Sequence, residues 1–423
     1  MQPSLAPNGA YARTGCEGAR RMERHGGGPG GVWAYWRRVW RFAVLGLPPR
    51  TVWDVPTWGL CVPFRHWREE VRYDGVTFED NYSPGLGDTA RRLLPLRALY
   101  LVFLFLWPWT AFLRALRRGP RGRTYLRGAL RRPDLGVFFP HATFTDREFD
   151  WSRPDHALGM FHALAYLRTK APLFALDDKR TFHAACTQHG LPVPERVTRE
   201  EAVQRGGEWI AKSPRGDLGY GVRRLTAGEL ANLTTAEADE IVIETRLRNH
   251  PDLLRALPAT APLSSFRVIT TLDAETREPR VTRCAIRIGN AGKAADNTAQ
   301  GGIWAQVDPT HGTIRAGVTK KTFGKWKDQQ PIRYGEHPDT NRSFVGLRIP
   351  RFEENVALAL HAHRTLAPEA ISLGWDIALA ADGPALLEVN VWTVTYDYEP
   401  QTDALTPSAE AIVALLEKLN SKC

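Results

Sequence analysis

The stretch GWDIALAADGPALLEVNV, residues 374–391, decides the fold of the C-terminal part of this chain of 423 residues. Its middle, Ala-Asp-Gly-Pro at 381–384, has the composition of a tight turn and separates two runs of β-forming residues. The stretch therefore predicts a β-hairpin with its turn centred on Asp382 and Gly383. The apolar residues on either side of the turn predict that the hairpin is buried.

Three polar residues interrupt this apolar hairpin. The turn sets Asp376 opposite the 388–390 region, where Glu388 and Asn390 leave the same face of their strand because they are two residues apart. A solvated strand face would explain them, but the flanking residues favour burial, and burying unpaired carboxylates is costly. A hard cation such as Mg²⁺, which prefers oxygen ligands, would offset that cost. We therefore predict that Asp376, Glu388 and Asn390 hold a metal ion.

Composition sets broad limits on the protein. The length suggests two or three domains, and the formal net charge is +10. Five cysteines are scattered without a CxxC or Cys/His cluster, so we expect no zinc site and a reducing compartment, the cytoplasm.

The N-terminal region combines aromatic and basic residues. Residues 1–31 lack the apolar core of a secretory signal and are expected to be disordered. Residues 33–47 predict a helix, either packed on the body of the protein or lying in a membrane interface. Residues 98–113 carry no charge but contain Pro108, and eight arginines follow at 114–132. A buried helix and a monotopic or re-entrant insertion on an anionic membrane both remain open, whereas a full span is disfavoured. Nucleic-acid binding ranks below these because the basic run adjoins an apolar segment.

From residue 173 onward, short β-like runs alternate with helical stretches, which predicts an α+β fold. Strands are expected at 209–213, 240–247, 265–273 and 280–289, and helices at 352–367 and 408–419. The expected organisation is a disordered segment (1–31), a mainly helical, aromatic and basic region (32–135), a connecting segment (136–172) and an α+β domain (173–423).

Two lysines lie where a phosphate-binding site would need them. Lys179 opens an amphipathic helix, and Lys212 ends a strand that is followed by Gly216, Gly219 and Gly221. Glycines let the backbone approach a phosphate, and a lysine offers it a positive charge. The loop is not a Walker A motif because GK[ST] is missing.

Further candidates follow along the chain. The apolar strand at 241–247 carries Glu244 and Leu247 and could line an adenine slot. Arg267 and Arg287 are expected on adjacent strands, where two guanidinium groups on one face would neutralise a phosphate. A loop at 289–302 then carries Asn297 and ends in two glycines, so it is a candidate lid.

The order of these motifs resembles the ATP-grasp superfamily, and most closely its sugar-transfer-associated branch. The resemblance rests on the lysines, the glycine loop, Arg…Arg…N-x-x-x-G-G and D…E-x-N, and covers about residues 173–419. It implies two α+β subdomains that clasp ATP. It also implies phosphate contacts for Lys179 and Lys212, adenine contacts for Glu244 and Leu247, one or two Mg²⁺ (or Mn²⁺) ions on Asp376, Glu388 and Asn390, and a place beside the transferred phosphoryl group for Arg267, Arg287 and Asn297.

The implied reaction is the ATP-dependent joining of a carboxylate to an amine through an acyl phosphate. The family name adds an association with cell-surface polysaccharides. Two other functions stay open: a kinase-like transfer of phosphate to a hydroxyl group, and a membrane-attached module with a degenerate nucleotide site.

Overall fold

The computed structural model describes residues 31–45, 47–51, 54–55, 57–58, 61, 105–106, 169, 173–216, 219, 221–273, 276–297, 301–319 and 332–391. These fall into two compact units, one containing the described residues up to 169 and the other those from 173 onward. Almost all of the segments expected at 1–31, 98–113, 114–132 and 136–172, and the whole helix expected at 408–419, lie outside the described residues.

In the first unit, helix α2 (Val32–Val39) continues into a π-helical turn, η1 (Trp40–Val44). One side of this helix is buried through Tyr35 and Phe42, whereas Trp33 and Trp40 are 77% and 53% exposed. Arg38 points inward, and its Nε lies 3.5 Å from Oδ1 of Asp54. Within the described parts of the chain, no helix has the length and apolar character needed to cross a membrane.

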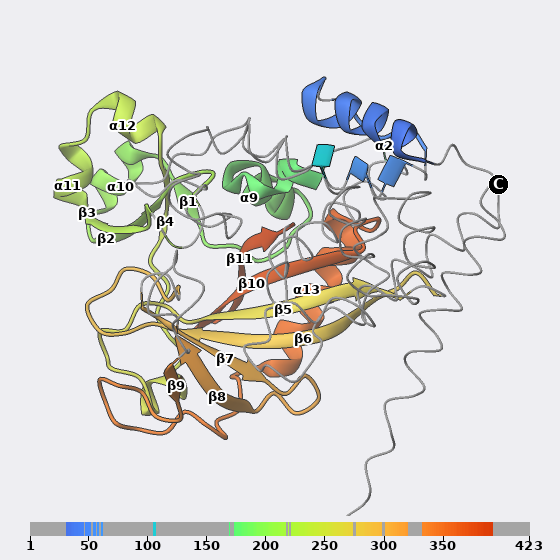
Figure 1. Ribbon diagram of the computed structural model, residues 1–423. Coiled ribbons are helices and arrows are strands. Elements are labelled where there is room, and N and C mark those ends of the chain that lie inside the picture. Colours follow the sequence, from blue (N-terminus) through green and yellow to red (C-terminus); the bar gives the residue numbers. More distant parts are fainter. Residues whose placement is uncertain are drawn as a thin grey trace, which may run out of the picture. The chain divides into compact units, whose positions relative to one another are not determined.

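The second unit contains two antiparallel sheets (Figure 1). The smaller has the strand order β1-β4-β2-β3, with β1 (Arg196–Val197), β2 (Glu208–Lys212), β3 (Arg223–Thr226) and β4 (Val242–Thr245). The larger has the order β11-β10-β5-β6-β7-β8-β9, with β5 (Ser265–Leu272), β6 (Pro279–Ile288), β7 (Ile303–Val307), β8 (Ile314–Thr319), β9 (Ile332–Tyr334), β10 (Ser372–Ala380) and β11 (Gly383–Asn390).

The helices of this unit are η6 (Leu173–Asp177), α9 (Lys179–Gln188), α10 (Arg199–Arg205), α11 (Ala227–Ala231), α12 (Thr235–Asp239), η7 (Leu253–Arg255) and α13 (Phe352–Leu366). The four strands expected between 209 and 289 and the helix expected at 352–367 are all present to within about two residues at each end, and the helix expected at 33–47 is present over 32–44. The α+β prediction is therefore confirmed for the described residues.

Helix α13 packs against one face of the larger sheet, over strands β5, β6 and β10 (Figure 1). The apolar alternation of the strands supplies this contact: Phe266 and Trp375 are fully buried there, and the Phe266 ring lies 5.9 Å from the ring of Phe352 on α13. The other face of the same strands carries the polar residues of the candidate site.

A buried polar network fastens α13 to this face. Both ring nitrogens of His363 form hydrogen bonds. Nε2 lies 2.9 Å from the carbonyl oxygen of Ala370, and Nδ1 lies 2.7 Å from Oγ1 of Thr270. Because a carbonyl only accepts, Nε2 carries the proton and Nδ1 accepts from Thr270. Trp375 Nε1 in turn donates to Thr270 Oγ1 over 2.8 Å. Burial lowers the pKa of His363 to about 4.

The hairpin predicted at 374–391 is present, but its turn lies one residue earlier than expected. Ala380 pairs with Gly383, so the two turn residues are Ala381 and Asp382. A β-bulge restores the predicted alignment: Ile377 pairs with Leu386 while Asp376 pairs with Glu388, which leaves Leu387 as the extra residue.

This bulge places core and site residues on opposite faces of β11. Without it, Leu386 and Glu388 would point the same way because they are two residues apart. With it, Leu386 is fully buried on the α13 face and Glu388 faces Asp376.

Candidate functional site

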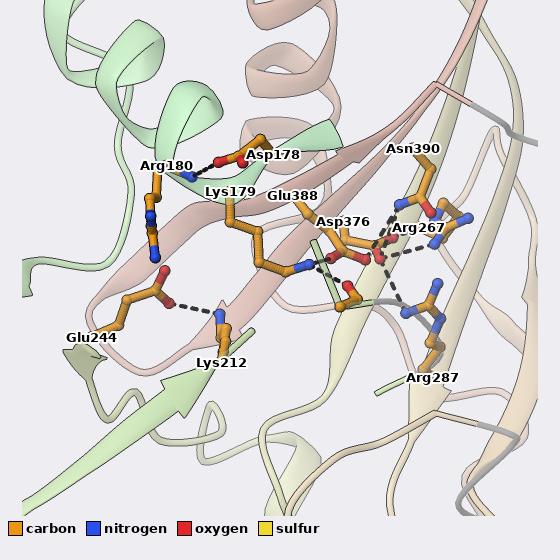
Figure 2. Close-up of polar contacts among 11 residues, drawn as sticks. Asp178, Lys179, Arg180, Lys212, Glu244, Arg267, Arg287, Asp376, Glu388 and Asn390 are labelled. Atoms are coloured by element: carbon orange, nitrogen blue, oxygen red, sulfur yellow. Dashed lines mark hydrogen bonds and ion pairs between the residues drawn. The ribbon is translucent and has the colours of Figure 1, made fainter. Parts of the chain in front are cut away.

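The centre of the site is the carboxylate of Asp376 on β10, which is 1% exposed. Arg267 lies directly opposite it on β5 and donates through Nε to Oδ1 and through Nη2, at 2.9 Å, to Oδ2. Arg287 on β6 brings Nη1 to 3.0 Å from Oδ2. Asp376 therefore neutralises two arginines that the sequence predicts on adjacent strands of one face (Figure 2).

Glu388 and Asn390 on β11 complete this cluster. The Asn390 amide nitrogen lies 3.4 Å from Oδ2 of Asp376 and 3.4 Å from Oε1 of Glu388. The three predicted oxygen-bearing side chains thus meet at one place, and a half-turn of the Asn390 amide would present its oxygen to both carboxylates.

The two carboxylates influence each other's ionisation. Burial raises the pKa of Asp376, against the attraction of Arg287, and repulsion from Glu388 raises it further. Burial also opposes ionisation of Glu388, but Lys179 and Arg287 outweigh it and hold the pKa of Glu388 at about 2. The repulsion between the two carboxylates is offset by the cations that contact them, Lys179, Arg267 and Arg287.

Lys179 links this cluster to helix α9. Its Nζ lies 3.2 Å from Oε2 of Glu388 and donates to the carbonyl oxygen of Gly216 over 2.5 Å. The lysine stands at the first position of α9 because Asp178 caps the helix and accepts from the backbone N–H of Arg180 over 2.9 Å. The helix start thus fixes where the lysine enters the site.

A second buried ion pair lies on the smaller sheet. Lys212 at the end of β2 brings Nζ to 2.6 Å from Oε2 of Glu244 on β4, and Glu244 is 4% exposed. Ile210 is the direct cross-strand partner of Glu244, so Lys212 reaches it diagonally along the same face. The predicted phosphate lysine and the predicted adenine residue are therefore neighbours.

The glycine loop after β2 approaches the start of α9. The backbone N–H of Lys179 donates to the carbonyl oxygen of Pro214 over 2.8 Å. Gly219 and Gly221 have φ angles of 75° and 72°, a conformation that residues with a Cβ atom rarely adopt. The glycines thus allow the chain to turn here, as the phosphate-loop hypothesis requires.

A cavity of about 780 Å³ joins these groups, and residues of both sheets line it. The predicted residues that line it are Lys179, Lys212, Gly216, Gly219, Glu244, Leu247, Arg287, Asn297, Asp376 and Glu388. Arg267 and Asn390 reach the cavity only through their contacts with Asp376, and Gly221 does not line it.

Sequence reasoning missed two contributors to the arginine pair. The Trp304 ring on β7 lies under both guanidinium groups, 5.9 Å from that of Arg267 and 5.7 Å from that of Arg287. Trp304 is the cross-strand partner of Arg287. The sequence could have indicated this, because Trp304 lies in a short apolar run that directly follows the two glycines at the end of the predicted loop.

The second missed contributor is Asp296. Its Oδ2 accepts from Ser265 through the backbone N–H at 2.8 Å and through Oγ at 2.6 Å. Burial raises the pKa of Asp296, whereas the nearby Arg287 and these hydrogen bonds favour the charged form. The sequence could have indicated Asp296 as a site residue, because it directly precedes the predicted site residue Asn297.

The ends of the 289–302 loop are tightly packed. A Cβ atom at Gly302 would lie 2.0 Å from the carbonyl oxygen of Asp296, so only glycine fits. Asn290 Nδ2 also donates to the carbonyl oxygen of Gly301 over 2.9 Å. Residues 298–300 lie outside the described residues, and the lid remains a prediction.

The side chains of Asp376, Glu388 and Asn390 offer oxygen atoms, which are the ligands that Mg²⁺ prefers. Within the ranges that the structure describes, no group of three or more His, Cys, Asp and Glu side chains is arranged to hold a metal ion. The site instead offers two carboxylates and one amide, and Mg²⁺ commonly takes few protein ligands and completes its shell with phosphate oxygens and water. Glu388, with a side chain that is 27% exposed, is the more open carboxylate, because both oxygens of Asp376 already accept from arginines.

The comparisons with known proteins agree with this geometry for one segment of the chain. Residues 221–396, which make up less than half of the chain, match the family model described as sugar-transfer associated ATP-grasp. The resemblance predicted from the sequence is thereby confirmed: this segment resembles the ATP-grasp superfamily and its sugar-transfer-associated family. No curated protein matches the chain.

Solved structures similar to the chain include ATP-grasp enzymes. The ligase PsnB with a minimal precursor is 17% identical, with 65% of this chain and 74% of that chain covered and a TM-score of 0.34. D-alanine–D-alanine ligase from Bacillus anthracis with ATP is 11% identical, with 62% and 70% covered and a TM-score of 0.33. D-alanyl-alanine synthetase A from Vibrio cholerae is 12% identical, with 64% and 74% covered and a TM-score of 0.33. At these scores the similarity carries no argument about function.

Proposed function

We propose that this protein is an ATP- and Mg²⁺-dependent ligase that activates a carboxylate as an acyl phosphate and joins it to an amine. The observation that carries the proposal is the meeting of buried cations and converging carboxylates in one cavity of about 780 Å³. Such a cavity can neutralise a triphosphate and also hold the metal that accompanies it. The ATP-grasp match over residues 221–396 supports the same conclusion.

The nucleotide would bind along the line from the smaller sheet to the carboxylate cluster. Lys179 and Lys212 would contact the phosphates, and Glu244 and Leu247 would contact the adenine. The contact of Lys212 with Glu244 supports this arrangement because it holds the lysine in place before the nucleotide arrives. The backbone at Gly216, Gly219 and Gly221 would approach the phosphates.

Asp376, Glu388 and Asn390 would hold Mg²⁺. The ion would offset the negative charge of the phosphates, and the convergence of oxygen-bearing side chains at this place supports the assignment. Lys179 now neutralises Glu388, so nucleotide and metal binding would exchange this contact for new ones.

Two chemical steps follow from this arrangement. An oxygen of the substrate carboxylate attacks the γ-phosphorus of ATP, the bond to the bridging oxygen breaks, and ADP leaves. The nitrogen of the amine then attacks the acyl carbon, phosphate departs with the bonding electrons, and the nitrogen loses a proton. Arg267, Arg287 and Asn297 would stand beside the transferred group and neutralise its charge. Trp304 beneath both guanidinium groups would keep them in position.

A kinase-like enzyme would use the same nucleotide site, and a screen separates the two reactions. Purified protein is mixed with Mg²⁺, ATP and every combination of a panel of carboxylic acids and amines, and the release of ADP is measured. A ligase releases ADP only when an acid is present, and forms an amide when the amine is added. Release of ADP with a hydroxyl compound and no acid would instead identify a kinase. Absence of ATP binding would identify a degenerate module.

The setting of the reaction is also part of the proposal. The family description, sugar-transfer associated, supports a sugar-linked acid or amine and a role in cell-surface polysaccharide formation at the cytoplasmic side of a membrane. Residues 33–132 would bind an anionic membrane without spanning it. The exposed Trp33 on α2 and Trp40 on η1 support this attachment, because tryptophan favours the interface between lipid and water.

A further inference from the structure

The cavity contains more positive charge than its own acids neutralise. Its lining includes eight lysine and arginine residues and four acidic residues. Three of these cations, Lys179, Lys212 and Arg287, contact carboxylates inside the cavity. Two more, Arg224 and Arg246, contact Glu208 on the smaller sheet.

Three lining cations remain: Arg223, which lies on β3 and helps to lower the pKa of Glu237, and two cations outside the smaller sheet. Arg248, three residues beyond the end of β4, and Lys293, in the 289–302 loop, both line the cavity. Among the described residues, no side chain forms a hydrogen bond or ion pair with either of them. Their charges are therefore available to a ligand.

The segments that carry the two cations both pack against the wall formed by residues 259–263, which also line the cavity. On one side, Asn249, next to Arg248, donates from Nδ2 to the carbonyl oxygen of Pro262 over 2.9 Å. On the other, Gly289 at the start of the loop packs so closely that a Cβ atom there would lie 2.1 Å from Cγ of Pro262. The loop returns to the wall through the contact of Asp296 with Ser265 at 2.6 Å.

This wall differs chemically from the carboxylate cluster. The lining residues 259–263 and 294–295 are small, apolar or uncharged, and none of them is acidic. As far as the structure describes the chain, an anion here would meet Arg248 and Lys293, and the neighbouring acid Asp296 already accepts two hydrogen bonds from Ser265. Lys293 is four residues from Asn297, so the two α-carbons are at most about 14 Å apart.

We infer that Arg248 and Lys293 form an anion subsite for the acid substrate. The inference rests on the proposed function, in which Arg287 and Asn297 hold the group being transferred. The substrate would then carry a second anionic group, a carboxylate or a phosphate, separate from the carboxylate that is activated.

Matched pairs of acids test this inference by binding rather than turnover. The full-length protein is first saturated with Mg²⁺ and the non-hydrolysable analogue AMP-PNP, which fills the nucleotide site. Calorimetry then compares glycerate with 3-phosphoglycerate, propionate with succinate, and glucuronate with glucuronate 1-phosphate. In at least one pair we expect the acid with the second anion to bind tenfold tighter or more, and the preferred pair tells a phosphate from a carboxylate.

Substitution of the two cations should remove this preference. In the double variant Arg248→Gln, Lys293→Gln, both members of the pair should bind within twofold of each other, while the affinity for AMP-PNP stays within twofold of the unchanged protein. Arg255→Gln is the matched control, because Arg255 has a side chain that is 77% exposed and pairs with Asp252 outside the cavity.

Three results would overturn the inference: no pair that differs, a double variant that keeps the preference, or a double variant that binds AMP-PNP tenfold more weakly. The last would assign both cations to the nucleotide. A protein that does not bind AMP-PNP at all would overturn the proposed function itself, and the subsite with it.

Discussion

The buried pair of Arg267 and Asp376 offers the sharpest test of how the site is held together. Arg267→Met removes the guanidinium group but keeps an apolar side chain of similar length. Asp376 would then lose two of its charge-assisted hydrogen bonds in a place where its carboxylate is 1% exposed. Breaking a buried ion pair by removing one partner costs about 3–5 kcal/mol, because the other charge stays buried.

The structure indicates the lower end of that range. Arg287 stays 3.0 Å from Oδ2 of Asp376 and still neutralises part of its charge. We therefore expect Arg267→Met to lower the free energy of unfolding by about 3 kcal/mol. The free energy is measured by urea unfolding that is monitored by circular dichroism. The unchanged protein and the variant are compared at the unfolding transition of the second unit.

A double-mutant cycle separates the pair from other effects of the substitution. Asp376→Asn removes the stranded charge, so the double variant should lose at least 1 kcal/mol less than the sum of the single variants, as contacting residues do. Arg280→Met on the same strand as Arg287 is the control, since its side chain is 64% exposed. A loss below about 1 kcal/mol for Arg267→Met, or strictly additive effects, would refute the reasoning.

Three further predictions concern the nucleotide, acid stability and the membrane. Lys212→Ala should weaken ATP binding about tenfold or more in calorimetry, and affinity for any acid substrate should change less; an unchanged ATP affinity would contradict its role. Because the folded-state pKa of His363 is about 4 and its ordinary value is 6.5, the unfolded chain takes up the proton first as pH falls. The contribution of His363 to the free energy of unfolding should therefore be fully present above pH 6.5. It should decrease toward pH 4 by at most about 1.4 kcal/mol per pH unit, and His363→Gln should make this pH dependence shallower. Full-length protein should float with anionic vesicles at low salt and release them at high salt; protein that remains at the bottom of the gradient would exclude the attachment.

Much of this site could be predicted from the sequence because its residues obey strand periodicity. Asp376, Glu388 and Asn390 were placed together by a turn and a two-residue repeat, and the structure brings them within hydrogen-bonding reach of one another. The same reasoning placed Arg267 and Arg287 on adjacent strands, where they share Asp376.

The parts that escaped prediction depend on tertiary contacts. The bulge at Leu387 could not be predicted, because it follows from the need to bury Leu386 and to face Glu388 toward Asp376 at once. Strand β7 was missed because it has only five residues and directly follows a glycine-rich loop. Trp304 therefore had no predicted strand to place it beneath the arginines.

The contact of Lys212 with Glu244 was also outside sequence reasoning. The two residues are distant along the chain, and nothing in either local motif indicates which strands of the smaller sheet are neighbours. Strand order decides this contact, and with it the division of the lysines between the two sides of the cavity.

The central claim is that the carboxylates at the end of the hairpin bind the metal that accompanies ATP. It is tested most directly by calorimetry of AMP-PNP binding with and without Mg²⁺, in the unchanged protein and in Glu388→Gln, together with ATP turnover. Glutamine keeps the shape of Glu388 but removes the charge. We expect Mg²⁺ to strengthen AMP-PNP binding only in the unchanged protein, and Glu388→Gln to lose ATP turnover while its circular dichroism spectrum is preserved. A Glu388→Gln protein that binds AMP-PNP in a Mg²⁺-dependent manner and turns over ATP normally would contradict it.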